Sequence, residues 1–578
     1  MFSSVDTIWV LLGAILVFFM QAGFAMVETG FTRAKNAGNI IMKNLMDFCI
    51  GSVAFWVIGF GIMFGKDIGG FIGQIDVMLR GNYDSTFPTY AFAIFQTVFC
   101  ATAATIVSGA MAERTKFSAY CLYSLIISLV IYPISGHWIW GGGWLAQMGF
   151  HDFAGSTAVH MVGGLAALVG AYILGPRTGK YDENGKVQPI PGHSLTLGAL
   201  GVFILWFAWF GFNGGSTVSA TGDETLVSMG SIIFNTNLAA ATATNAVMLI
   251  TWFRYGKPDI SMTLNGALGG LVAITAGCDA VSPFGAFMIG LISAPILVLG
   301  VEFIDQKLMV DDPVGAIGVH CLCGAAGTIL TGVFALNGGL LYGGGVSMLL
   351  TQAAGVAAVA VWVGATMWAV FSALRATVGL RVSADEEMEG LDIREHALAS
   401  SYADFMPVSV GPVPISAASS ADKTASLAEV KKMLGDHPKM TKVEIYTNPT
   451  KMEALKEALN EIGITGLTVT AVTGCGAHKG KKEFYRGALV KMTLLPKVKV
   501  ETVVCKVPVS KVIEAAKSVL YTGSAGDGKI FVYDVENVVR VSTGEEGFDA
   551  LQYDYDKARP ESVEAMKYDY ERQVGEAS

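Results

Sequence analysis

The sequence predicts an α-helical polytopic membrane protein that carries a soluble α+β domain at its C-terminal end. The chain has 578 residues, of which 52% are hydrophobic and only 15% charged, so it is too apolar for a soluble enzyme. Apolar segments run from the start to about Leu380 and then stop. Within them an acid and a histidine eight residues apart occur twice, as Asp152 with His160 and Asp312 with His320. Ionisable groups inside membrane spans are costly and mark functional sites, so the repeated pair predicts two structural repeats around one pore.

About eleven apolar segments are long enough to cross a membrane as helices of roughly 20 residues. They lie at about 7–27, 45–65, 91–111, 118–135, 154–175, 194–213, 229–250, 261–277, 284–302, 314–335 and 346–375. An odd number of spans places the two ends of the membrane domain on opposite faces. The N-terminus has no basic residue before its first apolar segment, so a cleaved signal peptide is not expected.

Basic residues in alternate loops predict the orientation. They follow the odd-numbered spans, at Arg33, Lys35, Lys43, Arg114, Lys116, Arg177, Lys180, Lys186, Arg254, Lys257, Lys307, Arg375 and Arg381. The positive-inside rule therefore places the N-terminus outside the cytoplasmic (inner) membrane and the C-terminus in the cytoplasm. The histidine segments become the fifth and tenth spans. This predicts a five-plus-five inverted repeat and one extra span, long enough to lie across the outside of the bundle.

Cysteine usage and charge exclude several other classes of protein. Eight cysteines are scattered along the chain, and the closest pair, Cys321 and Cys323, lies in an apolar segment where packing is the more frequent role. No disulfide framework, metal-ligand cluster or nucleophile–base arrangement is evident, so neither a metal nor an enzymatic activity is predicted. The net charge of −9 comes largely from the C-terminal third and gives no reason to expect a nucleic-acid partner.

Aromatic residues accompany the two histidines in these spans. Taken singly, each of these aromatics is more often a packing or interfacial residue: Phe99, Trp140, Trp206, Trp209 and Phe212. Together they can form an aromatic cage whose ring faces attract a small cation by roughly 0.5–2 kcal/mol. The hydroxyl of Ser216 can accept a hydrogen bond from that cation.

Six motifs resemble the ammonium transporter (Amt/Mep/Rh) family, in that family's order and spacing, over about residues 5–402. They are Phe95-Gln96-Thr-Val-Phe99, Gly109-Ala-Met-Ala-Glu113-Arg114, Trp140-Gly-Gly-Gly143, Asp152-Phe-Ala-Gly155 through His160, Trp209-Phe-Gly-Phe-Asn213-Gly-Gly-Ser216 and Asp311-Asp312-Pro313 through His320. The resemblance implies a homotrimer with one pore per subunit. Its substrate would be ammonium, with methylammonium as a further candidate.

The resemblance also implies a role for each candidate pore residue. Phe99, Trp140 and Ser216 match the external ammonium-recruitment site, Asp152 the acid beside it, Phe99 and Phe212 the stacked phenylalanine gate, and His160 and His320 the twin histidines that relay a proton. A dry pore opposes an intact charge, whereas ammonia can cross it while coupled imidazoles carry the proton. The competing interpretation is that the two histidines are a satisfied pair of core residues.

The polar C-terminal part divides into three further segments. Residues 1–382 form the predicted membrane domain, 383–439 a cytoplasmic extension and linker, 440–551 a compact domain and 552–578 a polar tail. Gly379–Val382 and Glu389–Asp392 resemble the transporter family's subunit-bridging extension, although the usual His-Gly-Glu reads His396-Ala-Leu here.

The segment order after Met440 predicts a ferredoxin-like fold. Strands are expected at Lys442–Tyr446 and Leu467–Val472, at Ala488–Leu495 paired with Val498–Val507, and at Ile530–Val535 and Val538–Ser542; helices are expected at Lys451–Ile462 and Val509–Leu520. The order βαββαβ is that of a ferredoxin-like plait. The glycine-rich segments between them are, by themselves, ordinary turns.

This domain resembles a PII nitrogen-regulatory (GlnK-like) protein. The matching residues are Gly474-x-Gly476, Lys479-Gly480, Tyr485-Arg486-Gly487, Leu495-Pro-Lys497-Val-Lys499, Gly526-Asp-Gly528-Lys529-Ile-Phe531 and Arg540 with Thr543-Gly-Glu545. The resemblance implies a trimer that binds ATP or ADP between subunits, with a long T-loop at about 476–494 whose Arg486 plugs an ammonium transporter. The implied nucleotide-binding residues are Gly474, Gly476, Lys479, Glu501, Gly526, Asp527, Gly528, Lys529 and Arg540.

Four departures from the PII pattern bear on ligands. His478 replaces the glutamine that helps hold 2-oxoglutarate, which argues against binding of that ligand. Ala477 and Ser542 replace phosphate-contacting arginines, which weakens triphosphate binding and favours ADP. Val490 replaces the tyrosine that some bacteria uridylylate.

Two hypotheses follow. In the first, the chain transports ammonium and its own PII domain closes the pore by T-loop insertion. In the second, the membrane domain senses ammonium, moves little of it and signals through the PII domain to a soluble cytoplasmic partner. The intact histidine pair favours transport, because a receptor needs no proton pathway.

Overall fold

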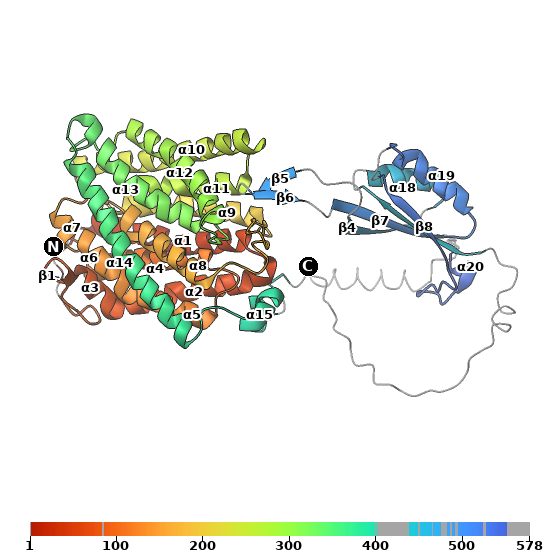
Figure 1. Ribbon diagram of the computed structural model, residues 1–578, viewed down its shortest axis with the longest axis horizontal. Coiled ribbons are helices and arrows are strands. Elements are labelled where there is room, and N and C mark those ends of the chain that lie inside the picture. The colour runs from red at the N-terminus through yellow and green to blue at the C-terminus, as the bar shows by residue number, and fades with distance from the viewer. Residues whose placement is uncertain are drawn as a thin grey trace, which may run out of the picture. The chain divides into compact units, whose positions relative to one another are not determined.

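The computed structural model describes residues 2–81, 83, 86–398, 401–402, 439–448, 451–464, 466–474, 482–485, 488–491, 495–523 and 527–551. The chain forms two compact units, one helical and one built around a sheet. Figure 1 shows the elements of each unit.

The helical unit contains ten helices that are long and apolar enough to cross a membrane, counted over the described residues. The helices and π-helical turns are α1 (Ser4–Phe31), α2 (Ala37–Ala54) continued by η2 (Phe55–Gly59) and α3 (Phe60–Phe64), α4 (Thr89–Ala110), α5 (Phe117–Ile126) continued by η3 (Ile127–Ile131) and α6 (Tyr132–Ile139), η4 (Ser156–Met161) with α8 (Val162–Leu174), α9 (Leu195–Gly215), α10 (Asp223–Tyr255), α11 (Ile260–Ile274), α12 (Pro283–Gln306), η5 (Ile317–Leu322) with α13 (Cys323–Phe334) and α14 (Ser347–Thr377). Every predicted span has its helix, and α11, at 15 residues, is a shorter apolar helix beside the ten.

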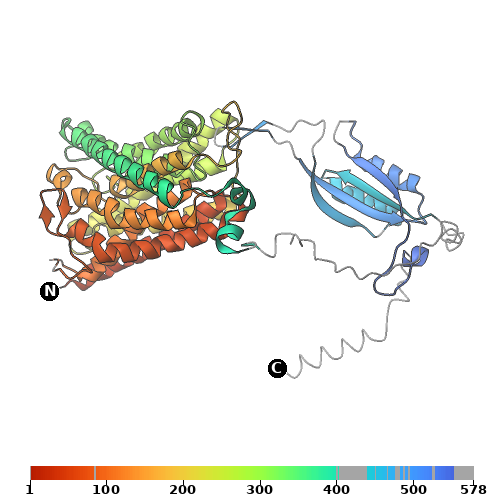
Figure 2. The ribbon, with the colours of Figure 1, turned by 60° about the horizontal axis from the view of Figure 1, so that its bottom comes forward.

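The long helices lie roughly side by side, and α14 crosses the others obliquely (Figure 1, Figure 2).

Lys43 was predicted to lie in a loop, and the structure places it elsewhere. Lys43, counted with the loop cations, lies fully buried inside α2. The α2 helix begins at Ala37, so Lys43 is almost two turns inside it.

The helical unit has two ends, named here by one residue of each. At the Trp140 end, the indole of Trp140 donates to the carbonyl oxygen of Asp152. At the Glu113 end, Glu113 pairs with Arg177. Helix α4 connects the ends: Phe99 lies against Trp140, and Glu113 follows the C-terminus of α4, roughly 17 Å further along its axis.

The two histidine helices run in opposite directions between these ends. Asp152 precedes the start of η4 at the Trp140 end. Asp312 precedes the start of η5 at the Glu113 end, where its neighbour Asp311 pairs with Arg177. This antiparallel arrangement is the inverted repeat that the sequence predicted.

The backbones of the two histidine helices touch at matched glycines. Four residues after each histidine stands a glycine, Gly164 in α8 and Gly324 in α13. A Cβ on Gly164 would lie 2.3 Å from the backbone nitrogen of Cys321, and one on Gly324 would lie 2.5 Å from the carbonyl oxygen of Ser156. Glycine at these positions therefore allows the two repeats to cross closely enough to bring the histidines together.

Two short helices, α15 (Ala384–Glu389) and α16 (Leu391–His396), follow α14 and pack on the Glu113 end. The carboxylate of Asp392 accepts hydrogen bonds from the backbone nitrogens of Gly38 and Asn39 at the start of α2. Lys35 donates to the carbonyl oxygen of Glu387 at 2.7 Å. The extension after the last span is thus fastened to the loop between the first two helices.

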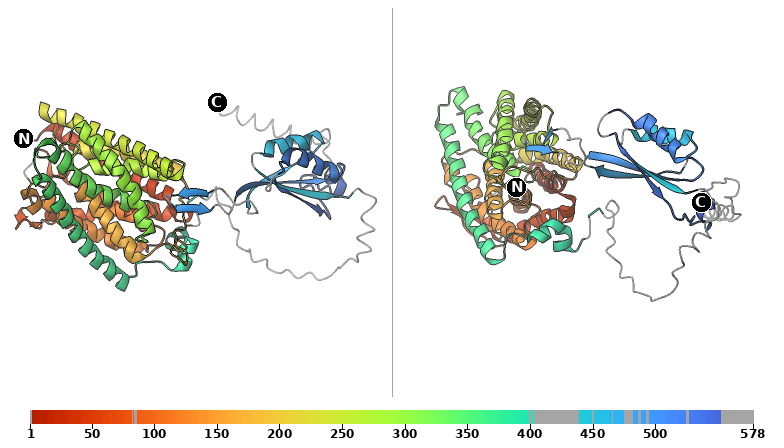
Figure 3. Two further views of the ribbon diagram at one scale, coloured as in Figure 1. Left: turned by 45° about the horizontal axis from the view of Figure 1, so that its top comes forward. Right: turned by 45° about the vertical axis from the view of Figure 1, so that its right-hand side comes forward.

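The second unit has the predicted order βαββαβ. Its elements are β3 (Thr441–Thr447), α18 (Met452–Glu461), β4 (Thr468–Gly474), β7 (Leu495–Val504), α19 (Val509–Leu520) and β8 (Lys529–Asp534). The strands form one antiparallel sheet in the order β4-β7-β3-β8, and α18 and α19 cover one of its faces (Figure 3). Val443, Leu455 and Val512 belong to the core between sheet and helices.

Two predictions for the chain after Met440 were wrong, one of a strand pairing and one of a strand. The segment predicted at Ala488–Leu495 does not pair with the following strand: β6 (Ala488–Lys491) pairs with β5 (Lys482–Tyr485), because β4 and β3 already flank β7. The segment at 538–542 forms no strand of the sheet: Val539 makes one isolated antiparallel bridge with Glu546, and a turn follows at 541–543.

Candidate functional site

A continuous column of aromatic rings leads from the Trp140 end to the two histidines. The ring of Trp140 lies 6.1 Å from that of Phe99, centroid to centroid, and Phe99 lies 4.2 Å from Phe212. Phe212 in turn stacks on His160 at 5.2 Å, and His160 stacks on His320 at 5.2 Å with an angle of 24° between the rings. The structure therefore brings together five of the pore residues selected from the sequence.

Ser216 lies one turn beyond Phe212, at the C-terminus of α9. Its hydroxyl donates to the carbonyl oxygen of Phe212 at 2.8 Å, and the side chain is half-buried. That bond uses the hydroxyl hydrogen and leaves the oxygen able to accept, which is the role expected toward a cation.

Asp152 is a helix cap. Its two carboxylate oxygens accept hydrogen bonds of 2.8–2.9 Å from four backbone nitrogens, those of Gly155, Ser156, Thr157 and Ala158. Burial raises the pKa of Asp152, and these backbone amides oppose that rise. The carboxylate thus shapes the start of η4.

Asp312 does the same for the second repeat. Its oxygens accept from the backbone nitrogens of Val314, Gly315 and Ile317. In each repeat a glycine with positive φ follows, 114° at Gly155 and 82° at Gly315, a conformation that glycine adopts at little cost. In both repeats, the acid and the glycine therefore fix the start and direction of the helix that carries the histidine.

Both histidines lie in π-helical turns, His160 in η4 and His320 in η5. Such turns are rare and often occur at functional sites. Sequence reasoning did not find them, because i→i+5 hydrogen bonding leaves no short signature in the residue pattern.

Three of the four ring nitrogens of these imidazoles are buried without a hydrogen-bond partner in the described part of the chain. Among the described residues, neither ring nitrogen of His160 has a hydrogen-bond partner, and Nδ1 of His320 has none. A buried polar atom left unpaired costs about 1–3 kcal/mol. This arrangement is the opposite of a satisfied pair of core histidines, and it suits a site where a ligand or a moving proton supplies the missing partner.

Trp209 and Phe24 complete the apolar surroundings of the pair. The ring of Trp209 stacks on His160 at 4.9 Å, and its indole nitrogen donates to the hydroxyl of Thr275 at 2.9 Å. The ring of Phe24 lies 5.9 Å from that of His320. Trp209 was among the aromatics expected to form a cage, whereas Phe24 had been assigned no role from the sequence, since a single aromatic in an apolar span is normally a packing residue.

Comparison with known proteins identifies the family. The family model named Ammonium Transporter Family matches residues 8–401, most of the chain. The chain belongs to the ammonium transporter family. A second family model, Nitrogen regulatory protein P-II, matches residues 440–545, so the transporter carries a PII domain fused to its C-terminal side. The relatives named below as ammonium transporters are not enzymes.

Similar transporters come from archaea and eukaryotes. Ammonium transporter Amt2 of Archaeoglobus fulgidus is 48% identical over 425 residues, which cover 70% of this chain and 89% of that protein. Ammonium transporter 1 member 3 of Solanum lycopersicum is 38% identical, with 68% and 92% covered. Among solved structures, a protein named Sensor Amt Protein shares 40% identity with a TM-score of 0.65, covering 68% of this chain and 98% of that one. Candida albicans Mep2 shares 30% identity with a TM-score of 0.61, covering 67% and 88%.

The Glu113 end of the transporter is held by buried charges. Glu113 pairs with Arg33 and, at 3.0 Å, with Arg177, which also pairs with Asp311 at 2.8 Å. Arg114 donates to the carbonyl oxygen of Asp311 at 2.7 Å. Burial alone would raise the pKa of Asp311, but the guanidinium groups of Arg177 and Arg114 hold it well below its usual range. The network ties together loops that follow four different spans.

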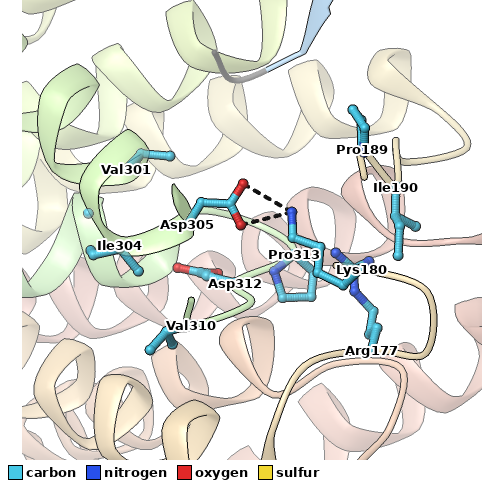
Figure 4. Close-up of a pocket in the computed structure, with 11 residues that line it drawn as sticks. Arg177, Lys180, Pro189, Ile190, Val301, Ile304, Asp305, Val310, Asp312 and Pro313 are labelled. Carbon is cyan, nitrogen blue, oxygen red and sulfur yellow. Dashed lines mark hydrogen bonds and ion pairs between the residues drawn. The ribbon is translucent and has the colours of Figure 1, made fainter. Parts of the chain in front are cut away.

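A pocket lies beside this network (Figure 4). Lys180 and Asp305 line it and pair with one another at 2.8 Å, with Asp312 and Pro313 next to them. The charges of Lys180 and Asp305 thus neutralise one another. None of the rings of the column that leads to the histidines lines this pocket.

The structure describes some of the nucleotide-binding residues predicted for the PII domain and not others. Gly476, Lys479 and Gly526 lie outside the described residues, as does Arg486 of the T-loop; Gly474 ends β4. Asp527, Gly528 and Lys529 precede or open β8, where a Cβ on Gly528 would lie 2.0 Å from the carbonyl oxygen of Tyr446. Asp527 accepts a hydrogen bond from the backbone nitrogen of Thr522 at 2.7 Å.

Arg540 and Glu501 are held by other partners. Arg540 pairs with Glu545 at 2.9 Å in the turn after β8. Glu501 pairs with Lys442 at 2.6 Å and Lys499 at 3.1 Å, and their hydrogen bonds lower the pKa of Glu501 to about 2. Glu501 therefore stabilises the sheet in this single chain, while its role at a nucleotide remains a prediction.

Proposed function

We propose that this transporter conducts ammonium by splitting it into ammonia and a proton at His160 and His320, and that its PII domain closes the pore. One observation carries the first part. A column of rings ends on the two stacked imidazoles of His160 and His320. Three of their four ring nitrogens are buried and have no hydrogen-bond partner among the described residues.

Recruitment uses the ring faces of Phe99 and Trp140 and the hydroxyl oxygen of Ser216. Ring faces attract a cation by roughly 0.5–2 kcal/mol, and the hydroxyl adds an acceptor for an N–H of ammonium. Asp152 adds negative charge nearby while it caps η4. Methylammonium, which keeps three N–H donors, fits the same contacts.

The Phe99–Phe212 pair then separates this site from the histidines. The two rings lie 4.2 Å apart and both side chains are buried, so they must move before a molecule passes. Potassium resembles ammonium in charge and size but cannot lose a proton. A dry passage past the rings therefore admits ammonia and rejects potassium, while the imidazoles carry the proton.

Loop charges support the orientation of the transporter. Arg33, Lys35 and Arg177 all lie at the Glu113 end. By the positive-inside rule that end faces the cytoplasm, which places the Trp140 end outside the cytoplasmic membrane and the PII domain within the cell.

The histidine relay is tested by ammonium-evoked current in proteoliposomes that contain the full chain. His160→Ala and His320→Ala each remove a relay group, and we expect each to lower the current by about a hundredfold or more. His193→Ala is the matched control, because His193 bonds to Thr32 and Tyr402 outside the ring column. Wild-type current in both pore variants would rule out the relay.

Closure is assigned to the T-loop of the PII domain. In this mechanism the transporter and the PII domain share the threefold symmetry of one homotrimer, and the segment at about 476–494 inserts Arg486 into the cytoplasmic mouth of each pore. Membership of the domain in the P-II family supports nucleotide control. Loss of two arginines at Ala477 and Ser542 favours ADP, and His478 argues against 2-oxoglutarate.

A second candidate function is ammonium sensing. It is favoured by the likeness to Sensor Amt Protein, which is 40% identical and covered over 98% of its length. In that case the membrane domain binds ammonium, conducts little and signals through the PII domain to a cytoplasmic partner. Saturable ammonium binding without current, and without neutral ammonia flux in a pH assay, would establish the sensor.

A further inference from the structure

A carboxylate shares a cavity with the second histidine. His320 and Glu28 both line this cavity, together with Phe24, Val314 and Asn265. Glu28 lies on α1 one turn after Phe24, whose ring is 5.9 Å from that of His320. Because α1 ends near Arg33, Glu28 lies roughly 6 Å nearer the Glu113 end than Phe24 does.

The carboxylate of Glu28 is buried and has no ion pair among the described residues. Only one of its oxygens, Oε2, accepts hydrogen bonds there, from the hydroxyl of Ser108 at 2.8 Å and the amide of Asn44 at 3.2 Å. Oε1 is not used in either bond. An acid at this depth is expensive unless it has a function, so Glu28 needs an explanation beyond packing.

A buried lysine belongs to the same region. Lys43 is fully buried, and its Nζ has no hydrogen-bond partner within the described part of the chain; it lies 5.4 Å from the ring centre of Tyr120. The charges of Lys43 and Glu28 interact electrostatically. The titratable groups that face Glu28 are Lys43 and Asp47 from α2, Tyr120 and Tyr123 from α5, and His320 from η5.

We propose that Glu28 is the proton acceptor on the exit side of the pore. It takes the proton from protonated His320 and returns it to ammonia that has reached the same cavity. The inference rests on the proposed function, because it needs the histidines to carry the proton that ammonium has lost.

The steps balance without another reactant. An O–H bond forms on Glu28 as the N–H bond of the His320 imidazolium breaks, leaving a neutral imidazole. The O–H bond then breaks as ammonia gains its fourth N–H, so the carboxylate is restored and ammonium leaves. Lys43 stabilises the carboxylate once the proton has gone, and Asn265, whose Nδ2 donates to Val314, contributes an amide to the same wall.

The decisive variant is Glu28→Gln, which keeps the size and hydrogen bonding of the side chain but cannot accept a proton. In the full chain we expect the ammonium-evoked current to fall by about a hundredfold. Ser108→Ala removes one hydrogen bond to Oε2 but keeps the carboxylate, so its current should fall by no more than about tenfold. Equal loss in both variants would show that Glu28 acts through packing and would overturn the proposal.

Two further measurements separate the possible failures. Infrared difference spectra on ammonium addition should contain a protonated-carboxyl band that Glu28→Gln removes and Asp47→Asn retains; a band unaffected by Glu28→Gln overturns the proposal even where that variant transports poorly. His160→Ala and His320→Ala are measured in parallel. Loss of current in those variants with wild-type current in Glu28→Gln overturns the role of Glu28 alone, whereas wild-type current in the histidine variants overturns the relay itself.

Discussion

At the scale of single residues, the helical unit holds two kinds of buried histidine. His137 is fully buried with both ring nitrogens engaged, Nδ1 with the carbonyl oxygen of Met63 at 2.8 Å and Nε2 with Asp67 at 3.0 Å. His160 is equally buried, yet neither of its nitrogens has a partner among the described residues. The same fold can therefore satisfy a core histidine, and the described residues leave both nitrogens of His160 without a partner, as the proposed proton relay requires.

Recruitment can be tested at Trp140. Trp140→Leu removes the ring face that lies 6.1 Å from Phe99, and we expect the half-saturating ammonium concentration of the current to rise about two- to thirtyfold. Trp144→Leu is the matched control, since Trp144 packs on Trp138 at the same end but lies outside the ring column. Equal shifts in both variants would contradict a cation-binding role for Trp140.

Sequence alone identified the ring column but not Glu28 or Lys43. Phe99, Trp140, Phe212 and the histidines occur in family motifs with fixed spacing. Glu28 and Lys43 lie just outside the predicted spans 7–27 and 45–65, and only the observed ends of α1 and α2 place them inside helices.

At the scale of helices, the histidine pair depends on the crossing of the two repeats. The apolar runs predicted the spans well, because a helix in a membrane must expose apolar side chains over a fixed length. The π-helical turns and the glycine contacts could not be predicted, since they depend on which backbone atoms of the other repeat come close. The pairing expected between the strands at 488–507 was wrong for a similar reason, because an alternating pattern predicts a strand but not the strand with which it pairs.

The crossing predicts an asymmetry between two glycines. Gly164→Ala places a methyl group 2.3 Å from the backbone nitrogen of Cys321, and we expect it to destabilise the fold by about 1–3 kcal/mol. At Gly364 in α14, an added Cβ meets no heavy atom of the described residues within 4 Å, so Gly364→Ala should be tolerated. Thermal unfolding of both variants in detergent measures the difference, and a similar midpoint for the two would contradict close contact between the repeats.

The charge network at the Glu113 end makes a second prediction at this scale. Removing one partner of a buried ion pair costs about 3–5 kcal/mol, so Asp311→Asn should lower the unfolding temperature markedly. Because the folded-state pKa of Asp311 is lowered, its stabilisation is complete above the ordinary aspartate pKa of about 4 and is lost as the pH falls below it.

Unfolding temperatures measured from neutral pH downward check this dependence. The difference between wild type and Asp311→Asn should be constant near neutral pH and should shrink below about pH 4. Thr178→Ala, which removes a hydroxyl bonded to Glu387 at the same end, serves as a control with a smaller loss. A difference that stays constant at acid pH would show that Asp311 does not act as a carboxylate.

At the scale of the whole molecule, the chain joins an ammonium transporter and a PII domain on one polypeptide. Both family matches follow from sequence motifs, and the order of the sheet agrees with the predicted ferredoxin-like plait. A fused PII domain is always present at the stoichiometry of the membrane domain, so the proposed control needs no separate partner.

Self-gating is tested most directly by ammonium-evoked current in proteoliposomes, comparing the full chain, the full chain with Arg486→Ala, and a chain ending at Tyr402. Each is measured without nucleotide, with ADP and with ATP. We expect all three to conduct, and nucleotide, ADP above all, to change the current only in the unaltered full chain. A current that nucleotide leaves unchanged in the full chain, or changes equally in all three, would contradict a transporter closed by its own PII domain.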